Sequence, residues 1–405
     1  MTDLQDRLRD AITASVDGAE PSFDPMTALL RRRHRHQLLR AAAAGLGLVV
    51  AAAAVAFAAT RHAQPGGHLP AAGTTKHPQA GKLAVPGALH GVRLVGPSGL
   101  RLLVSADPPY VLNVDTGAIT PITGLNVRGN PVLSVIAVGD DAVIWLDRRA
   151  SPGSFPRAEI YLIRHGTARA TPIATGWQVA PADGGRAIWL VRYTDAHHCT
   201  LTELGLDGRT RQHARPIDCS AQLVDAGSGA VLVRGRKIVD PATGRTLLAA
   251  RGLWAIAAGR ALSSNGPGQP LTLADLRTGN RWQLPWPSRI GGTDQAVVRA
   301  RGQLIALDFA DAAYGEGGTQ VTDVWLLDPA TRRFRHLPDM PAAVNLKFTS
   351  MAWSGDGRLV MLAQTNGPRG TRNLVAVWKP GQRQIALRPV LLPARNNGSD
   401  TFAIW

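Results

Sequence analysis

Two cysteines are the residues whose spacing most clearly suggests chemistry. Cys199 and Cys219 are the only cysteines in the chain. Asp207 and Gly208 lie between them and are typical of a tight hairpin turn, which would bring their strands side by side. We therefore expect a disulfide between Cys199 and Cys219, worth about 3 kcal/mol at best in the chain-entropy description of so small a loop.

A metal site is the alternative for the same cysteines, because His197 and His198 precede Cys199. Adjacent residues of a strand point to opposite faces, so only one of the two histidines could join a cluster with Cys199. The disulfide is the favoured interpretation. We predict no metal ligands and no cofactor.

The densest acidic cluster comprises Asp308, Asp311, Glu316 and Asp323, within DFADAAYGEGGTQVTD. Its spacing does not fit the calcium-binding EF-hand loop. Paired carboxylates could hydrolyse a glycosidic bond, but that chemistry depends on a separation in space that the sequence does not give. We expect instead a solvated loop between two strands.

Motifs of the common enzyme classes are absent: the chain has no G-x-S-x-G, H-E-x-x-H, P-loop or G-x-G-x-x-G pattern. The glycine-rich stretch 315–318 does not lead from a strand into a helix, so it is not a phosphate cradle. We predict no catalytic residues, and we expect that the protein is not an enzyme.

Tryptophans supply candidate contacts of another kind. Trp282 and Trp286 lie in RWQLPWP, where the flanking prolines argue against a central strand. We predict that these two residues contact a ligand from an exposed aromatic loop. By contrast, Trp145 and Trp189 occupy matching places in AVIWL and AIWLV, which predicts a role in the core.

The overall composition describes a turn-rich, basic, globular chain. Its 405 residues include 43 Gly and 28 Pro, and 45 % are apolar. The formal net charge is +16, and only five of the 45 basic residues are Lys. Two cysteines exclude a disulfide-dense scaffold.

The N-terminal ninety residues divide into three predicted segments. Residues 41–59 are uncharged and apolar throughout and would span about 28 Å, close to the hydrocarbon thickness of a bilayer. Residues 1–40 place an arginine-rich run before this span, so the positive-inside rule predicts a cytoplasmic N-terminus. Residues 60–90 are a linker rich in Pro and Gly.

Two further interpretations concern this N-terminal part. Residues 2–16 carry an apolar stripe at helical spacing, which predicts a short helix that could dock a cytoplasmic partner. Ala56-Phe57-Ala58 resembles a signal-peptidase site, but the long leader favours an uncleaved anchor. In either case residues 91–405 are exported, which makes nucleic acid an unexpected partner.

Residues 91–405 contain a repeat of two turns with strands between them. A small-residue turn before an apolar strand recurs seven times, at 96–99, 139–141, 183–185, 227–229, 258–260, 301–302 and 356–357. A hairpin turn follows each of these, at 115–117, 165–167, 207–208, 240–244, 275–279, 328–331 and 380–381. Two turns per unit imply about four strands, and 315 residues over seven units gives 45 residues each, which suits a propeller blade.

The sequence therefore predicts an all-β fold, a seven-bladed β-propeller, with six or eight blades as the error to expect from the short interval between 227 and 259. The chain ends in TFAIW, an alternating strand. We predict that it pairs in the blade that takes the first residues after 91, which closes the ring and removes two free edges.

One repeat carries a recognisable motif. Residues 353–360, WSGDGRLV, resemble the WSPDG-type signature of TolB-like and WD40-like propeller repeats, with Gly355 in place of Pro. The complete arrangement resembles actinobacterial single-pass membrane proteins with an arginine-rich stub, an alanine-rich span and a propeller. That resemblance implies an extracytoplasmic propeller, with a loose link to sigma-factor signalling.

Two functions follow as expectations. The first is a membrane-anchored binding or scaffold module for a protein or an anionic envelope ligand, because the exported part carries most of the positive charge. The second is a propeller hydrolase or lyase that acts on envelope carbohydrate or peptide. A carboxylate-rich central channel would favour the second function, and an apolar or basic face would favour the first.

Overall fold

The computed structural model describes residues 89–127, 132–148, 157–195, 198–227, 229–250, 252–264, 269–288, 296–311, 321–344, 351–367, 370–393 and 401–404. The predicted stub (1–40), its helix at 2–16 and the predicted span (41–59) lie outside these residues, as does the linker up to residue 88. Within the described residues, no helix has the length and apolar character needed to cross a membrane.

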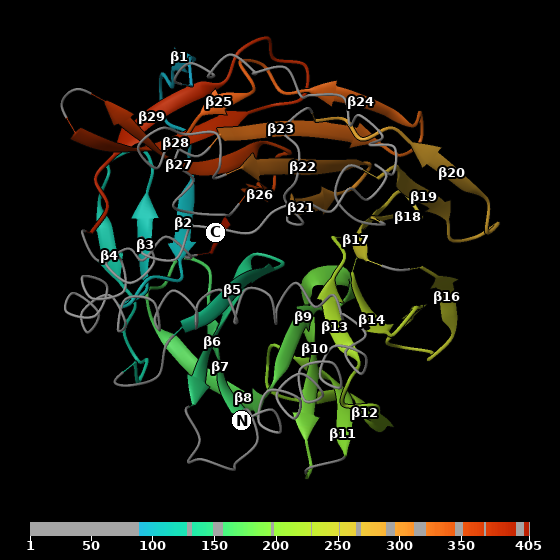
Figure 1. The fold of residues 1–405 in the computed structure, drawn as a ribbon. Helices are drawn as coiled ribbons and strands as arrows, with labels where there is room; N and C mark the ends of the chain where they lie inside the picture. Colours follow the sequence, from blue (N-terminus) through green and yellow to red (C-terminus); the bar gives the residue numbers. More distant parts are fainter. Residues whose placement is uncertain are drawn as a thin grey trace, which may run out of the picture. The chain divides into compact units, whose positions relative to one another are not determined.

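Residues 89–404 form seven sheets of a β-propeller, numbered here as blades in chain order (Figure 1). Each blade is given below from its inner to its outer strand. Blade 1 contains β30 (Phe402–Ile404), β2 (Arg101–Val104), β3 (Tyr110–Asn113) and β4 (Ile119–Pro121). Blade 2 contains β5 (Val132–Val138), β6 (Asp141–Arg148), β7 (Arg157–Ile163) and β8 (Ala170–Gly176). Blade 3 contains β9 (Gln178–Pro181), β10 (Ala187–Tyr193), β11 (Cys199–Gly205) and β12 (Thr210–Ile217), with a 3-10 turn at Asp183–Gly185.

The remaining blades repeat this order. Blade 4 contains β13 (Gln222–Asp225), β14 (Ala230–Arg234), β15 (Lys237–Val239) and β16 (Thr246–Ala249). Blade 5 contains β17 (Leu253–Ala257), β18 (Arg260–Ser263), β19 (Leu271–Asp275) and β20 (Arg281–Leu284). Blade 6 contains β21 (Ala296–Arg301), β22 (Leu304–Asp311), β23 (Val321–Asp328) and β24 (Arg333–His336), and β25 (Ala342–Ala343) also pairs with β23. Blade 7 contains β26 (Met351–Trp353), β27 (Leu359–Gly367), β28 (Gly370–Trp378), β29 (Ala386–Val390) and, outermost, β1 (Val92–Arg93).

This count confirms seven blades and excludes six or eight. Thirteen of the fourteen predicted turns connect the strands that the repeat assigned to them, either the first to the second or the third to the fourth of a blade. The turn at 96–99 leads instead from β1 of blade 7 into β2 of blade 1. Blade 4 accounts for the short interval because its strands have three to five residues each.

Acidic residues and glycines shape the turns between third and outer strands. In blade 5, Asp275 Oδ1 accepts N–H bonds from Arg277 (3.0 Å) and Thr278 (2.8 Å), and the Gly279 N–H returns to the Asp275 carbonyl (2.8 Å). Gly279 has a φ of 77°, a conformation that glycine adopts without a steric penalty. The Asp240–Gly244 turn of blade 4 has the same bonds. Local chemistry therefore explains why this turn recurs.

Each blade is buried on both faces by its neighbours. Seven apolar clusters fill the seven spaces between blades, so residues from 89 onward supply a complete core of their own. Second strands are therefore continuously apolar, as in the buried run Ala142–Leu146, whereas the outer strand β12 alternates toward solvent. Trp145 and Trp189 occupy equivalent places on β6 and β10, and both are buried between blades as predicted.

The C-terminal strand closes the ring. β30 pairs antiparallel with β2, with Leu103 opposite Ala403, as the TFAIW prediction required. The first strand residues after 91 behave differently from that prediction: β1 pairs in parallel with β29 on the outside of blade 7. The two ends of the propeller sequence are therefore both paired: β1 covers the outer edge of blade 7, and β30 covers the inner edge of blade 1.

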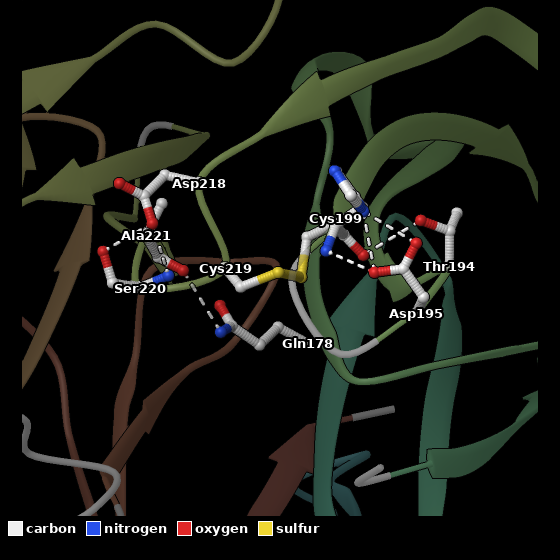
Figure 2. The surroundings of a disulfide bond; sticks show 9 residues. Gln178, Thr194, Asp195, Cys199, Asp218, Cys219, Ser220 and Ala221 are labelled. Atoms are coloured by element: carbon white, nitrogen blue, oxygen red, sulfur yellow. Dashed lines mark hydrogen bonds and ion pairs between the residues drawn. A yellow bond between two sulfur atoms is a disulfide. The ribbon is translucent and has the colours of Figure 1, made fainter.

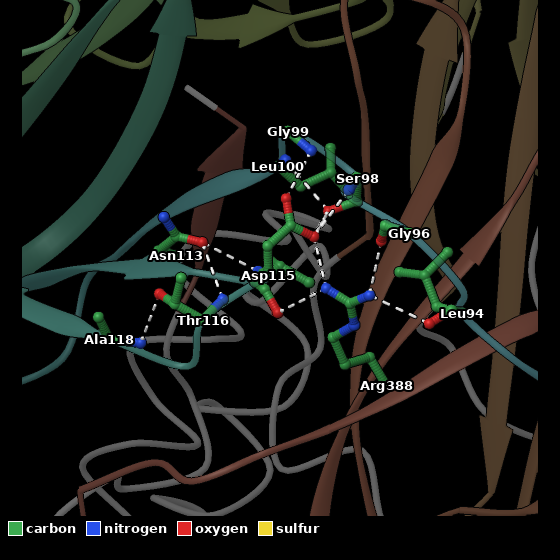
Figure 3. A network of polar contacts seen from close by, with 11 residues as sticks. Leu94, Gly96, Ser98, Gly99, Leu100, Asn113, Asp115, Thr116, Ala118 and Arg388 are labelled. Atoms are coloured by element: carbon green, nitrogen blue, oxygen red, sulfur yellow. Dashed lines mark hydrogen bonds and ion pairs between the residues drawn. The ribbon is translucent and has the colours of Figure 1, made fainter.

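Arg388 on β29 crosses this closure (Figure 3). It pairs with Asp115 Oδ1 (2.5 Å) and donates to the carbonyls of Leu94 (3.0 Å) and Gly96 (2.8 Å). Burial acts to raise the pKa of Asp115, but N–H and O–H bonds from Ser98, a bond from Gly99 and the Arg388 charge together lower it. One guanidinium thus connects blade 7, blade 1 and the segment that leads from β1 to β2.

Other arginines bridge successive blades by donating to backbone carbonyls. The bridges are Arg164 to Leu206 (3.1 Å), Arg215 to Pro241, Arg281 to Ala249 (2.6 Å), Arg260 to Pro329 (2.5 Å) and Arg301 to Gly355. A guanidinium has five N–H donors in a fixed plane and suits such contacts better than an ammonium group. This use is a structural reason for the bias toward arginine.

Candidate functional site

Two members of the acidic cluster, Asp308 and Asp323, lie on neighbouring strands of blade 6. Asp308 on β22 is opposite Val324, and Asp323 on β23 is opposite Phe309. Both carboxylates are buried, with 2 % and 3 % of the residue exposed. The prediction of a solvated loop is therefore wrong for these two residues, because β22 and β23 extend further toward the connection than the sequence suggested.

Register places the two carboxylates on opposite faces of the sheet, because residues paired across antiparallel strands share a face. Phe309 belongs to the core between blades 5 and 6, so Asp323 points there. Val324 belongs to the core between blades 6 and 7, so Asp308 points to that space. The two carboxylates cannot act on opposite sides of one scissile bond.

Asp323 accepts bonds from three side chains. Its Oδ2 accepts from Ser288 Oγ (2.5 Å) and Trp325 Nε1 (2.8 Å), and its Oδ1 contacts His336 Nε2 (2.5 Å). Burial acts to raise the pKa of Asp323, but the bonds from His336, Ser288 and Trp325 outweigh it and lower the pKa below its usual value. Asp323 is therefore a fixed negative charge whose acceptor positions are occupied.

Strands of two blades position this network. Trp325 and His336 are paired across β23 and β24, and their rings stack at 4.2 Å between centroids. Ser288 follows β20 of blade 5 and reaches Asp323 across the space between the blades. His336 is one-third exposed, so the network joins the interior to the surface.

An aromatic cluster packs beside the network on the same side of blade 6. The Trp286 ring lies 5.0 Å from Phe309 and 5.8 Å from Trp254, centroid to centroid. Trp254 and Trp286 are half-buried, and the buried Trp286 Nε1–H has no acceptor among the described residues. An indole donor next to partly exposed rings can bind a polar acceptor on a ligand.

Asp308 has the opposite electrostatic character. Burial, together with the negative charge of Asp323, raises its pKa to about 8. Its Oδ1 and the nearby Thr322 Oγ1 are buried without partners among the described residues. Asp308 is therefore a neutral carboxylic acid at pH 7.

Of the two predicted tryptophans, Trp282 lies within β20 and Trp286 lies two residues after the end of this strand. Trp286 belongs to the aromatic cluster just described. Trp282 is half-buried on the outer strand, with the guanidinium groups of Arg260 and Arg332 at 5.5 Å and 5.2 Å from its ring. The structure thus brings Trp286, but not Trp282, to the Asp323 network.

The two cysteines are joined in a disulfide (Figure 2). Cys199 begins β11, and Cys219 follows β12, whose Ile217 is opposite Cys199. Near it, Gln178 Nε2 donates to the Ala221 carbonyl (3.3 Å), and Gln178 Oε1 accepts from the Leu223 N–H (2.5 Å). The disulfide and Gln178 together hold the connection from blade 3 to blade 4.

Among the described residues, no three His, Cys, Asp or Glu side chains are grouped closely enough to hold a metal ion. His198 contacts Asp195 (2.7 Å) on the surface instead.

Ser288 and His336 were not singled out by sequence reasoning, whereas Asp308 and Asp323 were named there as members of the acidic cluster. One signal was present: Asp323 and Trp325 are two residues apart in VTDVWLLD, which puts them on one face of a strand. The distant partners Ser288 and His336 have no comparable signal, because only the packing of blade 5 on blade 6 and the pairing of β24 bring them close.

The fold defines the chain as a seven-bladed β-propeller. No protein-family model matches its sequence, and no curated protein matches it by sequence comparison.

Solved structures of similar fold include TolB from Acinetobacter baumannii, at 14 % identity over 76 % of this chain and 67 % of that one, with a TM-score of 0.41. The β-propeller domain of the Trilobed protease from Pyrococcus furiosus is 11 % identical over 75 % of this chain and 98 % of that domain, with a TM-score of 0.44. The Pyrococcus horikoshii acylaminoacyl peptidase is 12 % identical over 72 % of this chain and 50 % of the peptidase, with a TM-score of 0.44. The similarity concerns the fold alone and assigns no activity.

Proposed function

We propose that this protein is a membrane-anchored, extracytoplasmic β-propeller that binds a protein or an anionic envelope ligand as a scaffold, without chemical turnover. Residues 41–59 are the anchor in this proposal, and residues 1–40 remain in the cytoplasm, where residues 2–16 could engage a partner and pass on a signal.

The placement of Asp308 and Asp323 is the observation that carries the binding function. The two buried carboxylates face different spaces between blades, so they do not form an acid–base pair around one substrate. Ser288 and His336 both bond to Asp323. A serine nucleophile requires a base within hydrogen-bond reach of its hydroxyl, and here Asp323 occupies that position.

The inner strands give a second argument. Among their described residues, Asp225 on β13 is the one acidic residue, whereas Arg299 and Arg301 lie on β21. The channel wall is therefore not carboxylate-rich, which supports binding over carboxylate hydrolysis.

The disulfide supports export. Structural disulfides persist in oxidising compartments and are rare in the cytosol. The Cys199–Cys219 bond therefore agrees with an extracytoplasmic propeller.

A propeller hydrolase or lyase is the second candidate, because Ser288, Asp323 and His336 do lie together next to half-buried tryptophans. Its substrate would be envelope carbohydrate or peptide. Substrate binding would then have to move Ser288 from Asp323 to His336.

Protease treatment of intact cells that express the chain with a C-terminal tag tests the topology. We expect loss of the tag and a protected N-terminal fragment in the membrane. Full protection of the tag would overturn the proposal.

Incubation of the purified protein with isolated envelope fragments tests the function. We expect retention of envelope material on the protein and no soluble fragments. Release of fragments that is abolished by Ser288→Ala, but not by Ser220→Ala at an exposed turn, would establish the hydrolase instead.

A further inference from the structure

One end of the propeller is built mainly from tight turns; in blade 1, no turn joins the inner strand β30 to β2, and the segment after β1 leads into β2 instead. In an antiparallel blade, the turn between the first and second strands and the turn between the third and fourth strands lie at the same end of the sheet. We call this end of the seven blades the hairpin face. The structure describes these turns completely except for residue 228.

Exposed cations gather in the turns between third and outer strands. In the described residues, six of the seven blades contribute at least one exposed Arg or Lys here. These residues are Arg164, Arg169, Arg209, Arg211, Arg245, Arg277, Arg281, Arg332, Arg333, Lys379 and Arg383. Because these turns connect the outer strands, the cations surround the rim of the hairpin face.

The carboxylates of the same turns fold back onto their own backbone. Asp207 accepts from the Arg209 N–H (3.0 Å), Asp240 from Ala242 (2.7 Å) and Asp328 from Ala330 (2.8 Å). Asp240 and Asp328 are half-buried, whereas the arginines beside them are exposed. In the turns of blades 4 and 6 the cations are therefore more exposed than the carboxylates, whereas the exposed Asp207 of blade 3 pairs with Arg211 (3.0 Å).

Trp282 adds an aromatic ring to this basic rim. It is the second residue of β20, which follows the turn of blade 5, and the guanidinium groups of Arg260 and Arg332 lie 5.5 Å and 5.2 Å from its ring. Tryptophan flanked by arginine is typical of the interface between membrane and water.

The N-terminal part of the chain joins the propeller at the same face. The Val92 N–H donates to the Ile385 carbonyl (2.9 Å), and β1 runs parallel to β29 from the turn end of that strand. The residues before Val92 therefore lead toward the hairpin face, and Leu89 is buried in the core there beside Ile385.

We propose that the hairpin face docks on anionic lipid headgroups of the membrane that holds the anchor. This inference rests on the proposed function. The proposed span at residues 41–59 precedes the residues that join the propeller at the hairpin face, so the chain would run from the membrane to this face. Basic residues near an anionic surface each strengthen binding by about fivefold at low salt, and the effect decays over a Debye length of about 10 Å. Charges at the far end of the blades would contribute little.

Vesicle binding by residues 84–405, which contain their own core, tests the docking surface. The probes are vesicles of phosphatidylcholine alone and of phosphatidylcholine mixed with phosphatidylglycerol in equal parts. We expect binding to the mixed vesicles only, and weaker binding as salt is raised.

The variants compare the two ends of the blades. The combination Arg209→Gln, Arg277→Gln and Arg333→Gln neutralises exposed cations in three blades of the hairpin face. We expect it to weaken binding to mixed vesicles by about a hundredfold, since three factors of about five multiply. The matched control is Arg236→Gln, Lys237→Gln and Arg372→Gln, at the opposite end, which we expect to change binding by less than about twofold.

Three results would overturn the docking proposal: no binding to mixed vesicles, equal binding to phosphatidylcholine alone, or equal losses in the two triple variants. Binding of soluble polyphosphate without vesicle binding would assign the face to an anionic polymer and also overturn the lipid surface. Because residues 84–405 lack the predicted span, this assay fails or succeeds independently of the protease test of the anchor.

Discussion

Replacement of Asp308 by Asn should make the stability of the propeller less dependent on pH. The pKa of Asp308 is about 8 in the folded protein, raised from 3.8 by burial and by the charge of Asp323. Between these two values the folded protein holds a proton that the unfolded chain has released, so stability falls as pH rises. The penalty is absent below about pH 4 and complete above about pH 8.

The size of the effect follows from the shift. A shift of about four pKa units at 1.36 kcal/mol each amounts to roughly 5 kcal/mol of destabilisation above pH 8, as an order of magnitude. Asn cannot ionise, so Asp308→Asn removes this pH-dependent term. The amide introduces donors into a site where the Asp308 carboxylate already lacks a partner, and that cost of about 1–3 kcal/mol does not depend on pH.

Urea unfolding of residues 84–405, followed by tryptophan fluorescence at pH 5, 7 and 9, measures the prediction. The free energy of unfolding of Asp308→Asn minus that of the wild type should increase steadily from pH 5 to pH 9. Asp356→Asn is the control. The bonds from Arg358 and Ser354 outweigh burial and lower the pKa of Asp356 to about 2, so the stability that ionised Asp356 contributes is lost only below pH 4. The difference in unfolding free energy between Asp356→Asn and the wild type should therefore be flat from pH 5 to 9. An equally flat difference for Asp308→Asn would refute the assignment of a neutral buried acid.

Three further perturbations test the closure and the disulfide. Arg388→Ala should lower the free energy of unfolding by about 2–3 kcal/mol because Asp115 and three carbonyls lose a half-buried partner, whereas Arg211→Ala at an exposed pair should change it by less than about 0.5 kcal/mol, both measured by urea unfolding. Removal of residues 401–405 should abolish cooperative unfolding, since β2 loses its inner partner and the buried Phe402; a truncated chain with unchanged unfolding would contradict closure by β30. Cys199→Ser with Cys219→Ser should destabilise by at most about 3 kcal/mol and make the protein insensitive to reductant, and the wild type should lose comparable stability when reduced.

Repeated local patterns made the fold readable from the sequence. Turns such as Asp240–Gly244 and Asp275–Gly279 are stabilised by the Asp carboxylate and by the glycine conformation. Both residues lie within a five-residue segment, so the local sequence is enough to predict the turn. Trp145 and Trp189 could be assigned to the core because the repeat placed them identically. The residue pattern likewise suggested Cys199 and Cys219 as partners, because one hairpin separates them.

The candidate site was less accessible to the same reasoning. Asp308 and Asp323 were read as part of a loop, because the glycine-rich stretch between them masked how far β22 and β23 extend. Whether two carboxylates share a cleft depends on strand register, and a shift of β23 by one residue would put Asp323 on the same face as Asp308. The Asp323 network also needs Ser288 from another blade.

Sequence by itself determined the blade number, the turn chemistry and the closing role of the C-terminal strand, because each depends on residues close together or on a regular period. Only the tertiary structure decided that β1 covers the outer edge of blade 7, that Arg388 connects the closure, and that Asp323 is charged while Asp308 is neutral. These features depend on contacts between residues as far apart as Asp115 and Arg388, and on the burial that those contacts create. Local propensity carries no information about either.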